Sequence, residues 1–410
     1  MTERDYDVVL YGATGFVGRQ TVAYFAQHAG ALRWAIAGRN EAKLRQVREA
    51  CGKGAAHAGI VVADAQAAAA LDVLAKSTRV VLSTAGPFAL YGSALVAACV
   101  NNKTHYVDIT GETPWVRGLI DRHDAQAAKD GTRIIPCCGF DSVPSDLGAW
   151  LVNEAMRQRH GESCTSIKAC FSLRGGFNGG TLASAFNMMD SGQARALADP
   201  YLLNPPEGRP ARQAADADPI APHHDEDFGA WVGPFFMGPV NTRVVRRSAA
   251  LLGYAQGGQA FHYQEYLRFG GGPAAALAAA GMSLGMGAAQ GAMTLAPMRK
   301  LARRFAPAPG QGPSEKSMDR GSFRCELIGK SAGGHVVAGF IADRGDPGNR
   351  ATTKMVCEAA LALAAGVSNL PGGPLLGGVL TPASGVGNML AMRMRAAGMT
   401  VDPDVSVERG

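Results

Sequence analysis

The sequence lacks the cysteine spacings that metal and disulfide sites need. Its eight cysteines are scattered apart from the adjacent pair Cys137 and Cys138, and no Cys-x-x-Cys occurs. This disfavours a zinc site and a secreted disulfide framework, and it favours a reducing compartment. Adjacent cysteines rarely meet disulfide geometry without strain, so we interpret the pair as two small buried residues.

Charge is also sparse, because only 18% of residues are charged and the net charge is +6. No run of Lys and Arg resembles a nucleic-acid surface, whereas a small positive excess suits an enzyme whose cofactor carries several phosphates. The start, residues 1–7, is polar and leads directly into an expected strand, so we expect no signal peptide and a cytoplasmic protein. Residues 223–227 (HHDED) have the composition of a metal cluster without its spacing, and no metal is expected.

A chain of 410 residues, 47% of them hydrophobic, is too long for one ordinary core and predicts two domains of α/β class. Over residues 1–150, short apolar runs alternate with helical patterns, which is typical of a Rossmann-type doubly wound parallel sheet. The expected strands are 7–11, 33–37, 59–62, 79–83, 105–109 and 132–136, and the expected helices are 16–28, 41–50, 65–75 and 92–101.

The remainder predicts a mixed α+β domain over residues 151–378 that binds the substrate and supports a homodimer. Its expected strands, 166–173, 323–328 and 335–341, suggest a separate antiparallel sheet. The segment 379–410 is expected to form a turn and a helix that pack back on the first domain. The Pro-, Asp- and Ala-rich stretch 201–228 is interpreted as a long loop and a candidate lid, and 306–321 as a second irregular segment.

Residues 269–298 carry no charged side chain, and four Lys or Arg residues follow within 299–304. Length alone would allow a membrane span, but the stretch is mostly Ala and Gly and is bracketed by Pro273 and Pro297. The preferred interpretation is a buried or dimer-interface helix, since its glycine spacing permits close helix contact. Shallow lipid association through this helix and its basic flank is the alternative.

The strongest motif follows the first expected strand, where glycines recur every three residues and a helix opens at once. Gly12 permits the tight turn, Gly15 lets the backbone approach a pyrophosphate, and Gly18 lets helix and strand pack closely. The N–H groups and the dipole at the helix start would hold the phosphates. The candidate cofactor-binding residues here are Gly12, Ala13, Thr14, Gly15, Phe16, Val17 and Gly18.

The end of the second strand distinguishes NADP(H) from NAD(H), because an NAD site places an acidic residue there. This sequence has Arg39 and Asn40 at that place, with Lys43 one turn into the next helix. A guanidinium matches a 2′-phosphate by paired charged hydrogen bonds. The sequence therefore predicts NADP(H), and an exposed Arg that caps a turn is the alternative.

Two further segments are expected to touch the cofactor. Asp64, at the end of the third strand, is placed to contact the adenine, and a simple helix cap is the alternative. The small-residue turn after the fourth strand is expected to lie along the cofactor towards the nicotinamide. Its candidate residues are Thr84, Ala85, Gly86 and Pro87.

Several motifs occur in an order that resembles the saccharopine dehydrogenase-like oxidoreductases, and more closely their branch of trans-acting enoyl reductases of mycobacterial lipid synthesis. They are the glycine loop and residues 37–40, 85–88, 106–112, 139–146, 233–237, 243–247 and 345–348, so the resemblance covers most of the chain. It implies an NADPH-dependent enoyl reductase. A dehydrogenase acting at a C–N bond is one alternative, and a lipid-associated scaffold that keeps the nucleotide site without turnover is another.

The expected substrate lining is apolar. Saccharopine-forming enzymes handle a multiply charged amino diacid and need cationic anchors, whereas residues 175–181 and 234–237 and the Ala/Gly helix suit an apolar or acyl substrate better. Four arginines are candidate anchors for a carboxylate or phosphate, although exposed, solvated side chains are the preferred interpretation. They are Arg174, Arg243, Arg246 and Arg247.

An enoyl reductase adds a hydride at the β-carbon and needs a proton at the α-carbon, while the protein orients the reactants and excludes water. The candidate catalytic groups, all at expected carboxyl-end loops, are Tyr91, Asp108, Glu112 and Asp141. Each carboxylate has a structural alternative, which is preferred for any single one. Asp108 and Glu112 would cap a helix, and Asp141 would hold the hinge after the first domain.

Overall fold

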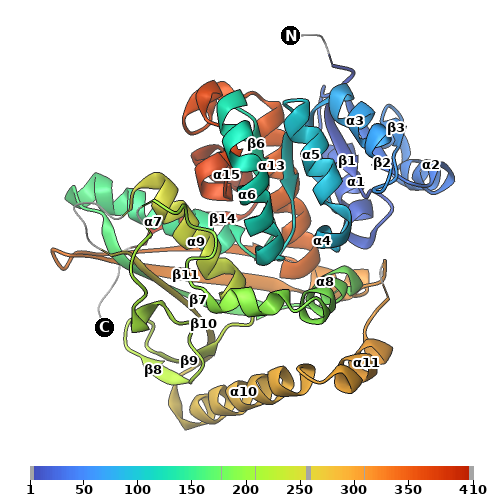
Figure 1. Ribbon diagram of the computed structural model, residues 1–410. Coiled ribbons are helices and arrows are strands. Elements are labelled where there is room, and N and C mark those ends of the chain that lie inside the picture. The colour runs from blue at the N-terminus through green and yellow to red at the C-terminus, as the bar shows by residue number, and fades with distance from the viewer. Residues whose placement is uncertain (1–3, 177, 208, 255–259, 309, 406–410) are drawn as a thin grey trace.

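The computed structural model describes residues 4–176, 178–207, 209–254, 260–308 and 310–405. Its two sheets and the helices around them are drawn in Figure 1. Expectations that concern residues 1–3, Phe177 and 406–410 lie outside the described residues.

The first sheet has seven parallel strands in the order β13-β6-β5-β4-β1-β2-β3. The strands are β1 Tyr6–Tyr11, β2 Trp34–Gly38, β3 Gly59–Val62, β4 Thr78–Ser83, β5 His105–Asp108, β6 Arg133–Ile135 and β13 Gly378–Val379. The six expected strands are confirmed to within about one residue at each end, as is the doubly wound fold class. The seventh, β13, was not expected; it comes from the C-terminal part and pairs with β6.

Helices cover both faces of this sheet. They are α1 Phe16–His28, α2 Glu41–Ala50, α3 Ala68–Ser77, α4 Phe88–Tyr91, α5 Ser93–Asn101 and α6 Thr113–Asp130, with the turn η1 Gly52–Ala55. Side chains alternate along β1, so that Val8 packs with α1 and α13 on one face and Val9 packs with α3 and α5 on the other. The expected bounds of α1 and α2 are confirmed. Helix α3 starts later than expected because a turn capped by Asp64 precedes it.

The second sheet is mixed and has the order β14-β12-β11-β7-β10-β9-β8. Its strands are β7 Cys164–Arg174, β8 His223–Asp225, β9 Ala230–Pro234, β10 His262–Gly270, β11 Ser322–Ser331, β12 Val336–Arg344 and β14 Thr400–Val405. The expectation of an antiparallel sheet is wrong for one pair, since β7 and β10 run parallel. The chain between them is long enough for a crossover connection, which parallel neighbours require.

The remaining helices connect the two sheets and flank the second (Figure 1). They are α7 Val143–His160, α8 Gly179–Asp190, α9 Gly238–Leu252, α10 Gly272–Met293, α11 Ala296–Phe305, α12 Glu315–Asp319, α13 Thr352–Ala364, α14 Pro382–Gly385 and α15 Gly387–Ala396. Short turns are η2 Gln193–Ala198, η3 Ala214–Asp216, η4 Pro347–Ala351, η5 Val367–Asn369 and η6 Gly373–Leu375. Helix α7 leads from the first sheet to the second, and η4 with α13 leads back. The expected boundary between residues 378 and 379 lies inside β13.

Three arginines of α9 are buried, which corrects the expectation that they are exposed and solvated. Arg243, Arg246 and Arg247 are each 2% exposed. Arg247 donates hydrogen bonds to the carbonyl oxygens of Leu203 at 2.6 Å and Val379 at 2.5 Å. These cations satisfy peptide carbonyls that would otherwise be buried without a donor, and they fix distant segments to α9. Arg174, by contrast, is exposed as expected.

The start of the 201–228 stretch is fastened to the body rather than free to act as a lid. Tyr201 and Leu203 are buried, and Arg117 of α6 donates to the carbonyl oxygens of Leu202 at 3.3 Å and Asn204 at 3.2 Å. The stretch later forms η3 and β8. The expectation of a lid is therefore wrong for residues 201–204.

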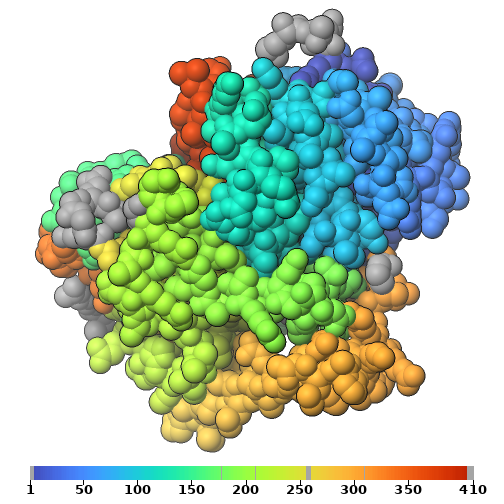
Figure 2. Space-filling view, viewed as in Figure 1, coloured from blue at the N-terminus to red at the C-terminus, as the bar shows by residue number. Residues whose placement is uncertain are grey.

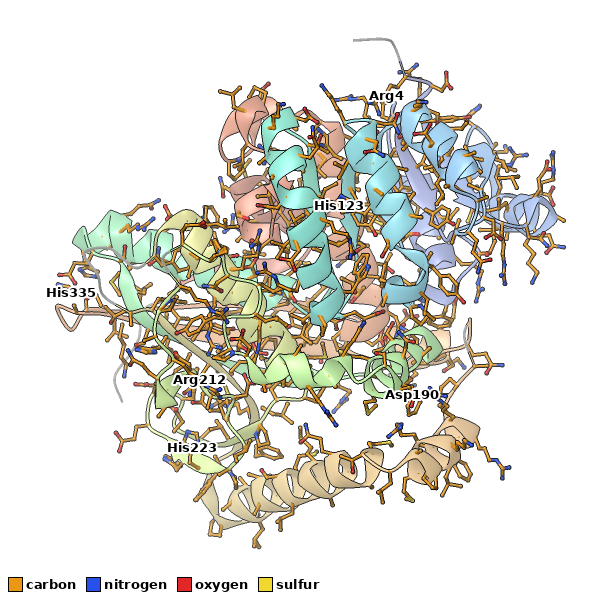
Figure 3. The ribbon with its side chains drawn as sticks, viewed as in Figure 1. Arg4, His123, Asp190, Arg212, His223 and His335 are labelled. Carbon is orange, nitrogen blue, oxygen red and sulfur yellow. The ribbon has the colours of Figure 1, made fainter. Side chains whose placement is uncertain are left out.

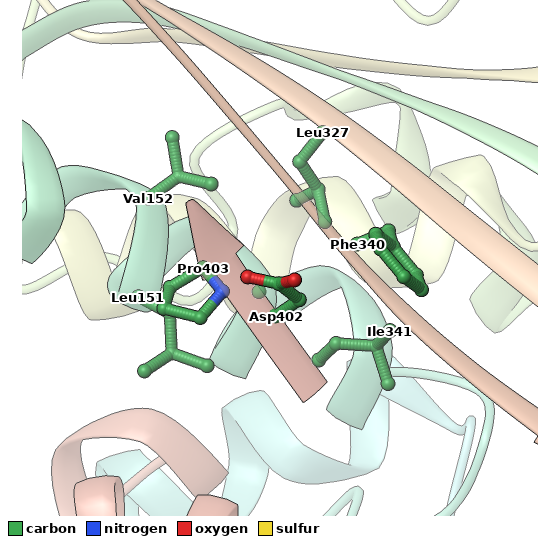
Figure 4. A pocket seen from close by; sticks show the side chains of 8 residues that line it. Leu151, Val152, Leu327, Phe340, Ile341, Asp402 and Pro403 are labelled. Carbon is green, nitrogen blue, oxygen red and sulfur yellow. The ribbon is translucent and has the colours of Figure 1, made fainter. Parts of the chain in front are cut away.

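A small pocket of about 140 Å³ lies where α7 meets the second sheet (Figure 4). It is lined by Gly148, Leu151, Val152, Leu327, Phe340, Ile341, Asp402 and Pro403. It encloses no cavity large enough for a water molecule, whereas ligand pockets usually enclose roughly 300–1,000 Å³, so it cannot hold a dinucleotide or an acyl chain.

We expect Arg247→Ala to lower the free energy of unfolding by about 3 kcal/mol, because it leaves buried carbonyls without a donor. Arg174→Ala is the matched control and should change that free energy by less than about 0.5 kcal/mol, since its side chain is exposed. Urea titration of both variants checks this. Equal effects would contradict the structural role of the buried cation.

Candidate nucleotide and active site

The glycine loop forms a cradle at the carboxyl end of β1. Gly12 has a φ of +84°, and a Cβ placed there would lie 2.9 Å from the Ala85 nitrogen. A Cβ on Gly18 would lie 2.1 Å from the Gly12 oxygen, so α1 and the loop touch directly. The first helical hydrogen bond runs from Arg19 N to Gly15 O at 3.0 Å. The three preceding helical N–H groups therefore have no acceptor within the helix and are placed to bind a phosphate.

Two cations stand at the end of β2. Arg39 and Lys43 are exposed, and neither has an ion-pair partner among the described residues. The one acidic residue in the first turn of α2, Glu41, is paired with Arg45. Asn40 caps α2, because its side chain accepts a hydrogen bond from Lys43 N at 3.0 Å. The end of β2 and the first turn of α2 therefore present Arg39 and Lys43 without an ion-pair partner among the described residues, which fits a 2′-phosphate.

Tyr11, the last residue of β1, reaches across the end of β2, because its hydroxyl donates to Ala63 O just after β3 at 3.3 Å. Burial raises the pKa of Tyr11 to about 12, the charge of Asp64 adds to the rise, and Arg39 opposes it. All three side chains are therefore neighbours at the edge where an adenosine would lie. Asp64 also accepts a hydrogen bond from Gln66 N at 2.9 Å, which closes a turn before α3. The N-cap residue of α3 is Ala67, so the alternative that Asp64 caps this helix is wrong.

The turn after β4 lies beside the glycine loop. Thr84 N donates to Tyr11 O at 2.9 Å, and Ala85 is the residue that a Cβ on Gly12 would strike. The Gly86–Pro87 peptide bond is cis. The two loops that were expected to follow the cofactor are thus in direct contact along the carboxyl edge of the sheet.

Glu112 links this turn to the second half of the molecule. Its carboxylate is 2% exposed and accepts hydrogen bonds from Phe88 N at 2.7 Å and Ala89 N at 2.9 Å. The Ser184 hydroxyl of α8 donates to the same carboxylate at 2.7 Å. Glu112 therefore caps α4 and fixes α8 over the edge.

Asp108, the last residue of β5, is fully buried below the carboxyl edge of the first sheet. It accepts hydrogen bonds from Thr110 N and Cys137 N, each at 3.0 Å, and from the Tyr106 hydroxyl at 2.9 Å. Burial raises the pKa of Asp108 to about 7, although these three donors oppose the rise. With no exposed surface and three donors, this carboxylate orders the turn after β5.

Asp141 differs from the other two carboxylates. It is only partly buried, and it has no hydrogen-bond partner among the described residues. A Cβ on Gly111 would lie 3.6 Å from its Oδ2 and 3.7 Å from the Met237 Cε, so all three residues meet at one place. Burial raises the pKa of Asp141 to about 6. Tyr91, the fourth candidate, is 38% exposed at the end of α4.

A buried polar network follows directly after Asp141, and sequence reasoning missed it. Ser142 donates to Asn241 Oδ1 at 3.2 Å, and Asn241 donates to Glu265 at 2.8 Å. Ser145 also donates to Glu265 at 2.8 Å. Burial raises the pKa of Glu265 to about 8. Its strand, β10, also carries His262, Gln264 and Arg268, so no local signal in the sequence marked Glu265, and its partners come from distant segments.

Two segments far apart in the sequence reach the phosphate cradle. Residues 310–314 lie between α1 and α8: Gly179 N donates to Gln311 O at 3.0 Å, and Arg19 donates to Gly310 O at 3.3 Å. The 345–348 motif lies at the start of α8, because Asn178 donates to Gly348 O at 3.5 Å and to Asn349 Oδ1 of η4 at 2.9 Å. The cradle is therefore bounded by both halves of the molecule.

The acidic residues of the segment 223–227 form ion pairs with lysine side chains. Lys168 donates to Asp225 at 2.7 Å and to Asp227 at 2.9 Å, and Lys330 donates to Asp227 at 2.6 Å. In the described part of the chain, no group of three or more His, Cys, Asp or Glu side chains is arranged to hold a metal ion.

Comparisons with known proteins agree with this geometry. A family model described as the saccharopine dehydrogenase NADP binding domain matches residues 8–135. A protein of Mycobacterium tuberculosis H37Rv, provisionally named a trans-acting enoyl reductase, is 39% identical over 417 residues and covers 98% of this chain and 98% of its own length. The trans-acting enoyl reductase of Mycobacterium bovis BCG is 37% identical over 417 residues, 97% of this chain and 98% of that protein.

A solved structure shares the fold. Apo saccharopine dehydrogenase (L-Glu forming) from Saccharomyces cerevisiae matches with a TM-score of 0.53 and 14% identity, covering 97% of this chain and 98% of that one. At this identity the match concerns the arrangement of the two sheets.

We expect Arg39→Ala to weaken NADPH binding about ten- to a hundredfold and to leave NADH binding unchanged, because only NADPH carries the 2′-phosphate. Arg45→Ala is the matched control, since Arg45 is exposed nearby but paired with Glu41. Calorimetric titration of each protein with both nucleotides measures this. An Arg39 variant with unaltered NADPH affinity would remove the 2′-phosphate assignment.

Asp141→Asn should stabilise the protein at pH 8 by about 1 kcal/mol and have little effect at pH 4. Burial raises the folded-state pKa of Asp141 from 3.8 to about 6, so the wild type loses stability as the pH rises through that range and the variant does not. Asp108→Asn is the contrast, because it disturbs three hydrogen bonds and should destabilise at both pH values. Urea unfolding at each pH measures these free energies of unfolding. Equal stability of the Asp141 variant and the wild type at pH 8 would refute the raised pKa of this unpaired carboxylate.

Proposed function

The chain belongs to the trans-acting enoyl reductase branch of the saccharopine dehydrogenase-like oxidoreductases and is an NADP(H)-binding oxidoreductase, and we propose that it reduces a carbon–carbon double bond in an acyl substrate. The observation that carries the proposal is the identity of 39% over 98% of the chain with a relative named for this activity. The alternative of a scaffold without turnover has no such support.

NADPH, when bound, supplies the hydride for such a reduction, and the protein orients the reactants and supplies the proton. We assign the phosphates to the loop of residues 12–18 and the 2′-phosphate to Arg39 and Lys43. Residues 84–87 would lie along the nicotinamide. Asn40, which caps α2, and Asp64, which closes the turn before α3, would contribute by holding these loops in place.

Asp141 is proposed as the proton donor. A general acid needs a carboxyl group that reaches the reacting atoms and a pKa near the working pH. These needs favour Asp141 among the candidates, since its carboxyl is partly exposed, has no hydrogen-bond partner among the described residues, and has a pKa raised by burial to about 6. It would transfer its proton to the α-carbon and regain one from water. Asp108 and Glu112 are positioning residues in this scheme, because several donors already occupy their oxygens.

An apolar substrate is favoured over a charged amino diacid. Met237 faces Asp141 across Gly111, which gives the reacting edge an apolar side chain. Arg246 and Arg247, two of the four candidate anchors for an amino diacid, are buried and bonded to backbone carbonyls. These contacts weigh against a dehydrogenase acting on a C–N bond.

For location and partners, we propose a cytoplasmic protein with contact to lipid or to a second copy of itself. Both proposals concern the same surface, helices α10 and α11. Their side chains are largely exposed, so the interpretation of α10 as a buried helix is wrong.

The test is NADPH oxidation with trans-2-enoyl thioesters of increasing chain length. The wild type should turn over, with kcat/KM falling as the pH rises through about 6, because only protonated Asp141 donates. Asp141→Asn should lower kcat about a hundredfold or more, lose that pH dependence and keep its NADPH affinity.

Asp121→Asn is the control, since Asp121 is an exposed carboxylate of α6, and it should retain wild-type kinetics. A wild type that reduces no enoyl thioester would refute the proposed reaction. An Asp141 variant with an unchanged pH profile would refute only the proton donor.

A further inference from the structure

Helices α10 and α11 form a projecting arm, residues 272–305, at the edge of the molecule. In Figure 1 the arm lies beyond β8 and β9, and in Figure 2 a furrow separates its gold and orange atoms from the green atoms of α8. Within the described residues, α10 is the one helix long and apolar enough to cross a membrane by length and composition, yet only 11% of that window is buried. The arm thus presents an apolar surface with little protein against it.

The packed side of α10 is narrow. Ala275 and Ala279 are its buried residues, and Ser283 continues the same face near Gly233 of β9. Leu277 and Leu284 are each 76% exposed. They are seven residues apart and lie about half a turn away from the alanines, so they point away from the body.

Helix α11 repeats this pattern beside a group of cations. Met298, Leu301 and Phe305 share one face by their spacing, and Phe305 is 84% exposed. Lys300 and Arg304 share another face, and both are exposed without an acidic partner among the described residues. The arm therefore combines outward apolar side chains with two free positive charges.

The other two cations of α11 hold the arm to the body. Arg299 donates to Asp190 at the end of α8 at 2.6 Å, and Arg303 binds the same carboxylate. Asp190 lies on the side of α8 that faces the arm (Figure 3). Arg303 also lies 5.2 Å over the ring of Phe186. Since α10 is held at β9 and α11 at α8, both ends are attached to one side of the molecule, and the arm cannot span a bilayer.

A lipid surface fits this arm better than a second copy of the chain. Across residues 284–291, about two turns of α10, every residue except Met286 is exposed, so the helix is uncovered around most of its circumference. A second protein would cover one face of such a helix, whereas lipid headgroups and acyl chains surround it. No charged residue occurs from 269 to 298, and the free cations follow directly.

We propose that the α10–α11 arm is a membrane-binding element that lies in the interface of an anionic bilayer. Leu277, Leu284 and Phe305 would enter the acyl region, and Lys300 and Arg304 would contact anionic headgroups. The small side chains of α10 let the helix lie flat at the depth of the headgroups. This proposal does not depend on the reaction that the protein catalyses.

Flotation of the full-length, NADPH-bound protein with phosphatidylcholine vesicles, with or without about one third phosphatidylglycerol, tests it. The wild type should float with the anionic vesicles and bind neutral ones about 25-fold more weakly, about fivefold for each of the two free cations. Leu277→Glu/Leu284→Glu should abolish flotation. Lys300→Ala/Arg304→Ala should weaken binding to anionic vesicles by about fivefold for each cation and leave neutral binding unchanged.

Leu375→Glu is the matched control, because Leu375 is 88% exposed outside the arm, and it should float like the wild type. Unchanged NADPH affinity confirms that each variant is folded. A wild type that floats with neither vesicle overturns the proposal, as does equal flotation of Leu277→Glu/Leu284→Glu. If light scattering shows a wild-type dimer that this double variant converts to a monomer, and neither protein floats, the arm is an interface between copies.

Discussion

The carboxylate of Glu112 determines where the two halves of the molecule meet, at the edge formed by the carboxyl ends of the strands of the first sheet. Its oxygens accept hydrogen bonds from the first turn of α4 and from Ser184 of α8, and it is buried. A buried carboxylate tolerates this position only while its donors remain, because an unpaired charge there would cost several kcal/mol, roughly. The position of α8, and with it the covering of the nucleotide loops, therefore depends on a residue that touches neither the phosphates nor the reacting atoms.

The same dependence on distant partners occurs deeper in the fold. Asp146 at the start of α7 accepts hydrogen bonds from Ser248 of α9 and from Ala383 N, at 2.8 Å in the latter case. Arg247 of α9 binds the carbonyl of Val379 in the last strand of the first sheet. The chain leaves the first sheet through α7, builds the second sheet and returns through α13. Strand β14 then completes the second sheet, and buried polar contacts hold this path together, so the C-terminal part contributes a strand to each sheet.

Local features of the sequence predicted most of the first sheet, because each strand is an apolar run between turns and the glycine loop has a fixed spacing. Burial of Arg246 and Arg247 was not predictable, since their acceptors lie on segments that no local pattern connects to α9. The sequence did not predict the parallel pairing of β7 with β10 or the two-residue strand β13, for the same reason. At the site, the sequence indicated Asp108, Glu112 and Asp141 without separating them. What separates them is how many donors reach each carboxylate, which only the folded chain determines.

Helix α8 connects the two proposals for this protein. Ser184 binds Glu112 at the reacting edge, and Asp190, six residues later, binds the cations of the arm. Six helical residues span about 9 Å, so the arm is attached within roughly 10 Å of the serine that binds Glu112. An acyl substrate dissolved in a membrane would face a large cost in exposing its chain to water on the way to a distant site. An arm lying in the interface would shorten that exposed path, and the rigid connection through α8 would keep the reacting edge at a constant height above the lipid.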